Sequence, residues 1–107
     1  MKINIQIYIL SRNRPLFLKL AINSALNQNH SQIKFEIIVS DNSDNENVSK
    51  MMQENYTNKN IRYIRRDRPL RHIDHMNLVV SELNSEYSVI FHDDDILHPD
   101  YLNTMSS

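Results

Sequence analysis

Residues 3–15 read INIQIYILSRNRP. Isoleucine stands at every second position from Ile3 to Ile9, and this period of two is typical of a β-strand. The polar run 11–14 ends the strand, and Pro15 suits the first turn of a helix because its missing N–H is not needed there. Apolar residues continue at helical spacing as far as Asn27. This stretch therefore predicts one strand followed directly by one helix.

The same strand-then-helix unit repeats along the rest of the chain. The further predicted strands are 35–39, 61–64 and 87–91, and the helices after them are 44–56, 73–83 and a short one from Pro99. Ser43 and Glu46 form a capping-box pattern at the start of the second helix. This alternation predicts an α/β fold: a single domain over residues 1–107, with a mainly parallel four-stranded sheet and flanking helices.

Composition excludes several classes of protein and site. The 107 residues carry 12 Lys+Arg and 13 Asp+Glu, and this balance argues against a globally basic nucleic-acid binder. The chain has no Cys, which excludes disulfides and thiolate metal sites, and no Gly, which excludes the dinucleotide fingerprint and the Walker A loop. No stretch of 18 apolar residues occurs, and polar residues interrupt the first apolar run. We therefore expect no transmembrane segment, no secretory signal and a cytoplasmic location.

Polar clusters follow all four predicted strands. They are Ser11-Arg12-Asn13, Asp41-Asn42, the arginine-rich run 65–71, and Asp93-Asp94-Asp95. The carboxyl ends of parallel strands lie along one edge of the sheet, where open α/β sheets bind ligands. We therefore expect these clusters to lie close together.

Each cluster has a structural and a functional interpretation. The aspartate triplet suits a hard divalent cation, Mg²⁺ or Mn²⁺, and it also suits a solvated acidic loop. Asp41 is equally suited to an Asx turn or helix cap and to accepting N–H or hydroxyl groups of a nucleoside. Arginines of the 65–71 run suit phosphate oxygens, although such runs are usually solvated. His72, Asp74 and His75 are expected on the solvent side of their helix.

Four stretches in order resemble the N-terminal half of a family 2 glycosyltransferase with the GT-A fold. They are 7–15 (IYILSRNRP), 25–28 (ALNQ), 35–43 (FEIIVSDNS) and 87–102 (YSVIFHDDDILHPDYL), together with Asn77. The family favours Thr-Tyr-Asn-Arg-Pro, Val-Leu-Asn-Gln and Glu-Ile-Ile-Val-Val-Asp-Asn-Ser in the first three, and its metal-binding Asp-x-Asp motif in the fourth. The resemblance covers essentially the whole chain and implies a Rossmann-like half-domain that binds a nucleotide-diphosphate sugar.

The resemblance also implies roles for individual residues. The nucleotide-sugar-binding set is Leu10, Ser11, Asn13, Asp41, Arg71 and Asp93, and the metal-binding residues are Asp94 and Asp95. Within it, the backbone near Ser11 and the side chain of Asp41 would hold the nucleobase, and Asp93 would lie near the ribose. Asp94 would bind Mn²⁺ or Mg²⁺ at the diphosphate. A UDP-sugar is the expected donor.

The implied reaction is inverting transfer of the sugar to an acceptor hydroxyl, in surface polysaccharide synthesis. The general base of such enzymes lies in the second half of the domain, so residues 1–107 are expected to bind the donor without turning it over. In one alternative, the full-length protein is associated with the cytoplasmic face of a membrane. A metal-dependent phosphohydrolase or receiver-like domain is a rival, disfavoured because Ser11-Arg12-Asn13 holds no carboxylate. A non-catalytic interaction domain that dimerises or swaps strands is another.

Overall fold

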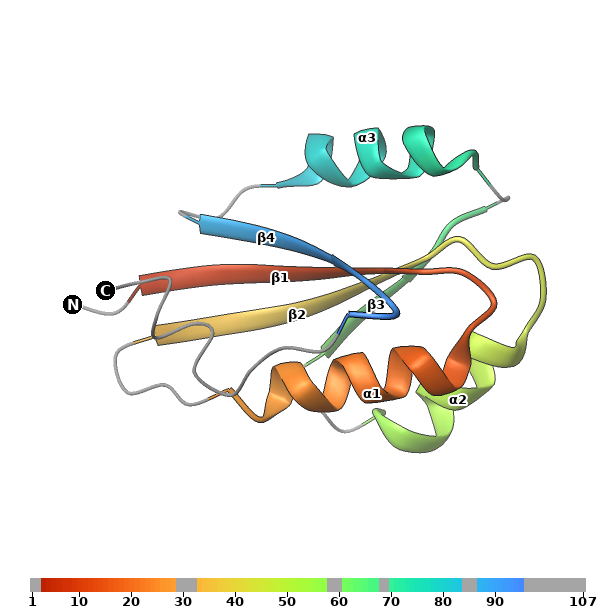
Figure 1. Ribbon diagram of the computed structural model, residues 1–107, viewed down its shortest axis with the longest axis horizontal. Helices are drawn as coiled ribbons and strands as arrows, with labels where there is room; N and C mark the ends of the chain where they lie inside the picture. The colour runs from red at the N-terminus through yellow and green to blue at the C-terminus, as the bar shows by residue number, and fades with distance from the viewer. Residues whose placement is uncertain (1–2, 29–32, 58–60, 68–69, 84–86, 96–107) are drawn as a thin grey trace.

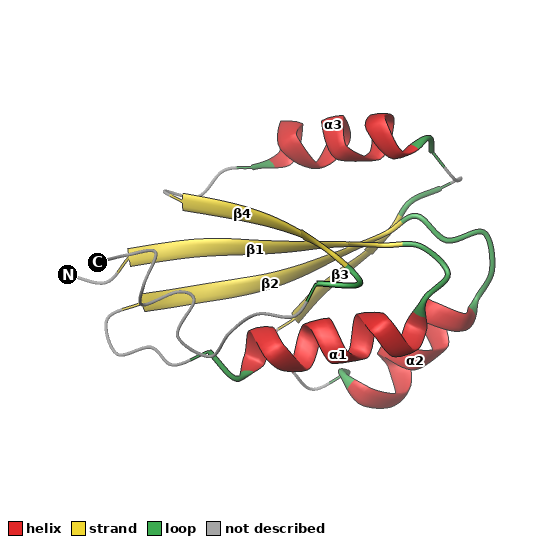
Figure 2. Ribbon diagram, viewed as in Figure 1, coloured by secondary structure: helices red, strands yellow, loops and turns green. Residues whose placement is uncertain are grey.

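The computed structural model describes residues 3–28, 33–57, 61–67, 70–83 and 87–95. The elements in chain order are β1 (Ile3–Ser11), α1 (Pro15–Leu26), β2 (Ile33–Asp41), α2 (Asn47–Asn55), β3 (Ile61–Arg65), α3 (His72–Glu82) and β4 (Tyr87–His92). The predicted order of strands and helices is confirmed over these residues (Figures 1 and 2). The short helix predicted from Pro99 lies outside the described residues.

The four strands form one parallel sheet in the order β3-β2-β1-β4. Figure 1 shows α1 and α2 on one face of this sheet and α3 on the other. Register pairs Ser11 of β1 with Asp41 of β2, and Leu10 with His92 of β4. The predicted α/β fold is therefore confirmed, and the central strand β1 brings the ends of its two neighbours together.

Helices on both faces explain why the strands are buried on both faces. Ile7, Ile9 and Ile37 pack with α1 and α2 in one apolar cluster, whereas Tyr8 and Ile38 pack in a second cluster on the side of α3. Fully burying a side chain of this size contributes roughly 1.5–3 kcal/mol. The alternation in β1 therefore separates two cores, with the larger under α1 and α2.

The capping box predicted at the start of α2 is wrong. The helix begins at Asn47, and Glu46 in the N-cap position makes no side-chain cap hydrogen bond. The hydroxyl of Ser43 is used elsewhere, since it donates to Asp41 and accepts the Asn13 N–H at 2.8 Å. Ser43 therefore joins two strand-end loops.

The buried face of α1 is narrower than its apolar sequence suggests. Leu18, Ala21, Ile22 and Ala25 are its buried residues, whereas Leu16, Phe17 and Leu20 are exposed. Among the described helices, none is long and apolar enough to cross a membrane.

Candidate functional site

A pocket of about 430 Å³ lies at the carboxyl edge of the sheet. Four of the predicted site residues line it: Leu10, Ser11, Asp93 and Asp94. Six further residues complete the lining: Arg12, Arg14, Asn42, His72, His75 and His92. The predicted convergence is confirmed for the ends of β1, β2 and β4, because residues up to 84 positions apart in the chain share one cavity (Leu10 and Asp94). The described arginines of the run 65–71 do not line it, and Arg65 and Arg66 border a separate hollow.

Ser11 lines the pocket at the end of β1 and carries a buried hydroxyl. Its side chain is 2% exposed, and its hydroxyl has no hydrogen-bond partner among the residues that the structure describes. A buried hydroxyl without a partner costs free energy, about 1–3 kcal/mol when compared with a satisfied one. The Ser11 hydroxyl is therefore a buried polar group that the described residues leave unsatisfied at the end of β1.

Asp93 is the buried carboxylate of the site. It accepts the backbone N–H of Arg12 at 3.1 Å, which ties the end of β4 to the loop after β1. Burial raises the pKa of Asp93, while this hydrogen bond and the charge of Arg14 oppose the rise. The backbone N–H of Arg12 and the guanidinium of Arg14 are therefore the groups that stabilise its ionised form most.

One guanidinium faces both carboxylates. The Nη1 atom of Arg14 lies 3.8 Å from an oxygen of Asp93 and 3.6 Å from an oxygen of Asp94. The two carboxylates can therefore converge on one positive group, as a divalent cation requires. No cluster of three or more metal-ligating side chains occurs in the described part of the chain. Asp93 and Asp94 fit a Mg²⁺ or Mn²⁺ ion of the kind that takes its remaining ligands from water and substrate phosphates.

Asp95 closes the turn that follows β4. Its carboxylate accepts the backbone N–H of His92 at 2.9 Å, and its own N–H donates to the His92 carbonyl at 3.0 Å. Asp95 is not among the residues that line the pocket. In this arrangement its carboxylate holds the turn on which Asp93 and Asp94 stand.

Asp41 lies at the same edge of the sheet but behind the pocket. Its side chain is fully buried, and one oxygen accepts the Ser43 N–H at 2.9 Å and the Ser43 hydroxyl. The other oxygen accepts the hydroxyl of Tyr63, whose pKa is raised by burial and then by this hydrogen bond and the charge of Asp41. The structure thus shows the Asx turn that Asp41 was expected to form in one of its two interpretations.

A sequence model of glycosyl transferase family 2 matches residues 6–106. The chain belongs to this family. None of the curated protein sequences matches it significantly.

Several solved structures share the GT-A, Rossmann-like fold of this family 2 chain. S. aureus TarS 1-349 in complex with UDP-GlcNAc is 15% identical with a TM-score of 0.76, over 99% of this chain and 30% of that protein. The complex of TarS 1-349 with UDP is 16% identical with a TM-score of 0.78, over 99% of this chain and 31% of that protein. The mannosyltransferase PcManGT from Pyrobaculum calidifontis, in complex with GDP-Man and Mn²⁺, is 12% identical with a TM-score of 0.74. The match covers 90% of this chain and 29% of that protein. The chain therefore spans less than a third of each of these proteins.

Asn42 of the family 2 domain fixes the basic loop beside the pocket. Its side-chain amide donates to the carbonyl of Leu70 at 2.8 Å, and its carbonyl oxygen accepts the Leu70 N–H at 2.7 Å. The guanidinium of Arg12 reaches the same Leu70 carbonyl at 3.4 Å. This pair of bonds from Asn42 resembles one step of a β-ladder and attaches the loop to the end of β2.

We expect Asn42→Ala to loosen this loop. Loss of both bonds to Leu70 lowers the free energy of unfolding by about 1–2 kcal/mol. Limited trypsin digestion should then cut sooner after Arg66 or Arg71, which mass spectrometry of the fragments detects. Asn55→Ala is the control, since it removes one amide bond to Met51 within α2. Equal rates of cleavage in the two variants would contradict this role of Asn42.

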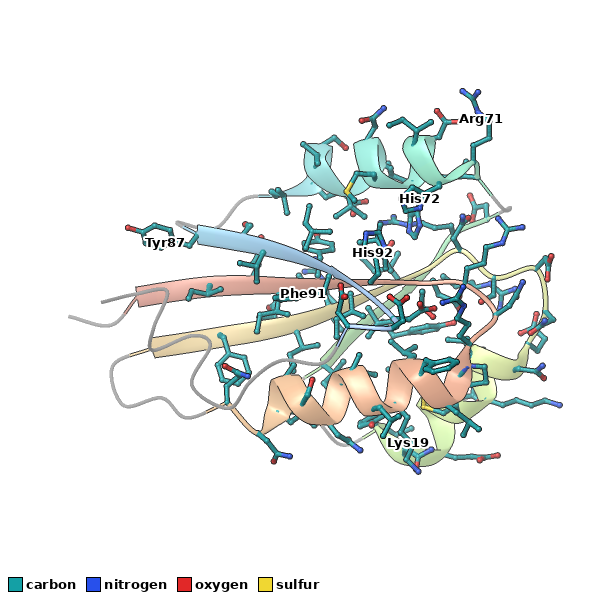
Figure 3. All side chains as sticks on the ribbon, in the orientation of Figure 1. Lys19, Arg71, His72, Tyr87, Phe91 and His92 are labelled. Atoms are coloured by element: carbon teal, nitrogen blue, oxygen red, sulfur yellow. The ribbon has the colours of Figure 1, made fainter. Side chains whose placement is uncertain are left out.

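Like Asp41, two more of the predicted donor-binding residues, Arg71 and Asn13, do not line the pocket. Arg71 is exposed and pairs with Asp74 at 2.8 Å, and Figure 3 shows its side chain pointing away from His72 and His92. Asn13 has a φ of 56°, a left-handed conformation that asparagine tolerates better than most residues. Its side-chain oxygen accepts the Asp44 N–H at 3.1 Å, so Asn13 holds the loop after β1 against the loop after β2.

Three histidines in the pocket wall were not predicted as site residues. His72 and His92 stack with ring centroids 5.1 Å apart, and Figure 3 shows them pointing toward one another between α3 and the sheet. His75 is 3% exposed, so its predicted place on the solvent side of the helix is wrong. Its spacing of four from the buried Val79 was the signal that could have placed it on the buried face.

His75 is buried because β2 offers it a polar partner. Its Nε2 atom lies 2.7 Å from the hydroxyl oxygen of Ser40, which also accepts the Arg66 Nε–H at 2.9 Å. Arg66 in turn forms two hydrogen bonds with the carboxylate of Glu82, at 2.7 and 2.9 Å. Burial lowers the pKa of His75 to about 4, so the ring is neutral at pH 7. This chain of polar side chains attaches α3 to the ends of β2 and β3.

Proposed function

We propose that this chain is the donor-binding part of a glycosyltransferase that moves a sugar from a nucleotide-diphosphate donor to an acceptor hydroxyl. The observation that carries the proposal is the pocket at the strand ends, where two carboxylates, Asp93 and Asp94, face one cationic group. Membership of glycosyl transferase family 2 supports it. So do the complexes of TarS with UDP-GlcNAc and of the mannosyltransferase with GDP-Man and Mn²⁺.

In this proposal the donor-binding residues act at two levels. Leu10, Ser11 and Asp93 contact the nucleoside directly, because they line the pocket. Asp41 and Asn13 act from behind, by holding the loops after β2 and β1 in place. Arg71 belongs to the proposed set through its place at the start of α3, where a change of rotamer turns its guanidinium to a bound phosphate.

The resemblance implied Asp94 and Asp95 as the metal-binding residues. In this proposal Asp94 holds the Mn²⁺ or Mg²⁺ ion with Asp95 as the flanking residue, and Asp93 is the second carboxylate because Asp95 does not line the pocket. When bound, the ion supplies positive charge against the diphosphate leaving group. The protein's own contribution is to fix both carboxylates through the turn that Asp95 closes and the bond from the Arg12 backbone to Asp93. Arg14 is the described cationic side chain that faces both carboxylates.

The proposed reaction proceeds with inversion at the anomeric carbon, by in-line attack of the acceptor hydroxyl. In this proposal residues 1–107 bind the donor without turning it over, since they span less than a third of the length of the solved structures that share their fold. A UDP-sugar is the proposed donor, and surface polysaccharide synthesis on the cytoplasmic side is the proposed setting.

We expect Asp94→Ala to weaken donor binding by about tenfold to hundredfold in the presence of Mn²⁺, the range typical for loss of a group that supports a metal site. Isothermal titration with UDP, UDP-GlcNAc, GDP and GDP-Man, each with Mn²⁺, measures this directly. The pocket of the unchanged protein should bind at least one of these with a heat that disappears when Mn²⁺ is removed.

Glu54→Ala is the control, because this exposed carboxylate of α2 lies outside the pocket. It should bind as the unchanged protein does. Folded protein that gives no heat with any of the four ligands would overturn the proposal, as would an Asp94→Ala variant with unaltered affinity.

A further inference from the structure

Arg14 faces the pocket carboxylates, although no role was predicted for it from the sequence. Its guanidinium lies within 4 Å of oxygens on both Asp93 and Asp94. A positive group between two carboxylates relieves their mutual repulsion. In the absence of a metal ion, Arg14 therefore satisfies the same two side chains that the ion would bind.

The other described arginines of this edge are occupied elsewhere. Arg12 binds the Leu70 carbonyl and Asp44, Arg65 binds the Ser43 carbonyl and Glu46, Arg66 binds Glu82, and Arg71 binds Asp74. Among the described residues, the ion pairs of Asp93 and Asp94 are made with Arg14 alone. Among the described side chains, Arg14 is therefore the one that would compete with a divalent ion for these carboxylates.

Arg14 is anchored through its backbone and not through its side chain. Its carbonyl accepts the Leu18 N–H at 2.9 Å, and Pro15 follows it at the first position of α1. The side chain is 53% exposed. The guanidinium can therefore leave the carboxylates for a nearby anion without any change in the position of α1.

We propose that Arg14 holds the cation position while the pocket is empty and moves to the diphosphate when a divalent ion binds to Asp93 and Asp94. This inference rests on the proposed function and adds a competitor and an order of events to it. The ion must displace Arg14, and the displaced guanidinium finds a new partner only when phosphate oxygens are present. Ion and nucleotide therefore bind with positive coupling, and by linkage each raises the affinity for the other by the same factor.

The test compares Mn²⁺ binding by the unchanged protein, Arg14→Gln and Arg14→Lys, with and without UDP. Loss of the free-Mn²⁺ signal in electron paramagnetic resonance gives the affinity without any measurement of activity. Without UDP, Arg14→Gln should bind Mn²⁺ about two- to fivefold more tightly, the size expected when a partly exposed ion pair stops competing. With UDP this advantage should vanish, and UDP itself should bind about tenfold more weakly, as expected for loss of a charge-assisted contact to phosphate.

Arg14→Lys keeps the charge and should follow the unchanged protein in the titration without UDP. Arg62→Ala is the matched control, since it removes an exposed arginine that pairs with Glu36 at 4.0 Å outside the pocket. Equal Mn²⁺ affinity of Arg14→Gln and the unchanged protein would overturn the inference, while a UDP complex that still needs Mn²⁺ would leave the proposed function standing. If UDP binds to none of the variants, the proposed function fails, and the comparison without UDP still decides whether Arg14 competes with the ion.

Discussion

Asp41→Ala is expected to lower the free energy of unfolding by about 3 kcal/mol, because it removes a buried carboxylate and leaves its donors unpaired. The donors are the Ser43 N–H and hydroxyl and the Tyr63 hydroxyl. Asp41 is 0% exposed, so water cannot replace the lost acceptor without opening the loop. Denaturant unfolding followed by circular dichroism measures the change.

Two further variants separate the contributions. Tyr63→Phe removes one donor and should cost about 1 kcal/mol. Asp44→Ala removes an exposed carboxylate three residues away, which pairs with Arg12 at 3.8 Å, and should cost less than about 1 kcal/mol. A loss for Asp41→Ala no larger than that for Asp44→Ala would show that the buried cluster does not stabilise the fold.

The second large effect is a loss of stability in mild acid that depends on His75. Burial, followed by the charges of Arg66 and His72, lowers the pKa of His75 to about 4, and Asp41 and Glu82 oppose this shift. The unfolded chain titrates this residue near its ordinary pKa of about 6.5. Between these two values the unfolded state binds more protons than the folded state, so stability decreases as the pH falls.

The size of this effect follows from the two pKa values. Full stability is present above about pH 6.5, and about 3 kcal/mol is lost by about pH 4. Unfolding free energies measured at half-unit steps from pH 7.5 to 4 should show this slope. The pKa of Glu82 is lowered by its hydrogen bond from Arg66. The stability that this carboxylate contributes is therefore lost only when the pH falls below its ordinary pKa.

His75→Gln removes the titrating group and keeps a side chain that can hydrogen-bond to Ser40. The decrease in the free energy of unfolding between pH 6.5 and 5 should be much smaller in this variant. His72→Gln is the control, because His72 is exposed and its removal should leave most of the slope. If His75→Gln and the unchanged protein lose stability equally over this range, the acid sensitivity has another origin.

Local patterns in the sequence were sufficient for the elements and for the edge at which the site lies. The period of two in β1 and the helical spacing in α1 depend on neighbouring residues only, so both were predicted closely. That the strand ends lie along one edge followed from one further rule for parallel sheets. The pairs Ser11–Asp41 and Leu10–His92 depend in addition on the strand order, which was not predicted.

Errors arose wherever a partner distant in the chain decides the role of a polar side chain. Ser43 was assigned to a helix cap, but the buried Asp41 takes its hydroxyl. His75 was assigned to solvent, but Ser40 makes its burial possible. The contact of Arg14 with Asp93 depends on β4 lying beside β1, which spacing along the chain does not reveal.

The floor and the walls of the pocket come from different parts of the fold. Leu10 and Ser11 of the floor belong to the central strand, whereas Arg12 and His72 of the walls are exposed residues at loop and helix ends. Substitutions of Arg12 and His72 therefore leave the two apolar clusters untouched and carry little folding penalty, whereas Asn42 and His75 of the same pocket also hold the fold together. A pocket built in this way can change the charge of its exposed rim through a few surface exchanges, while the frame that gathers the carboxylates stays as it is.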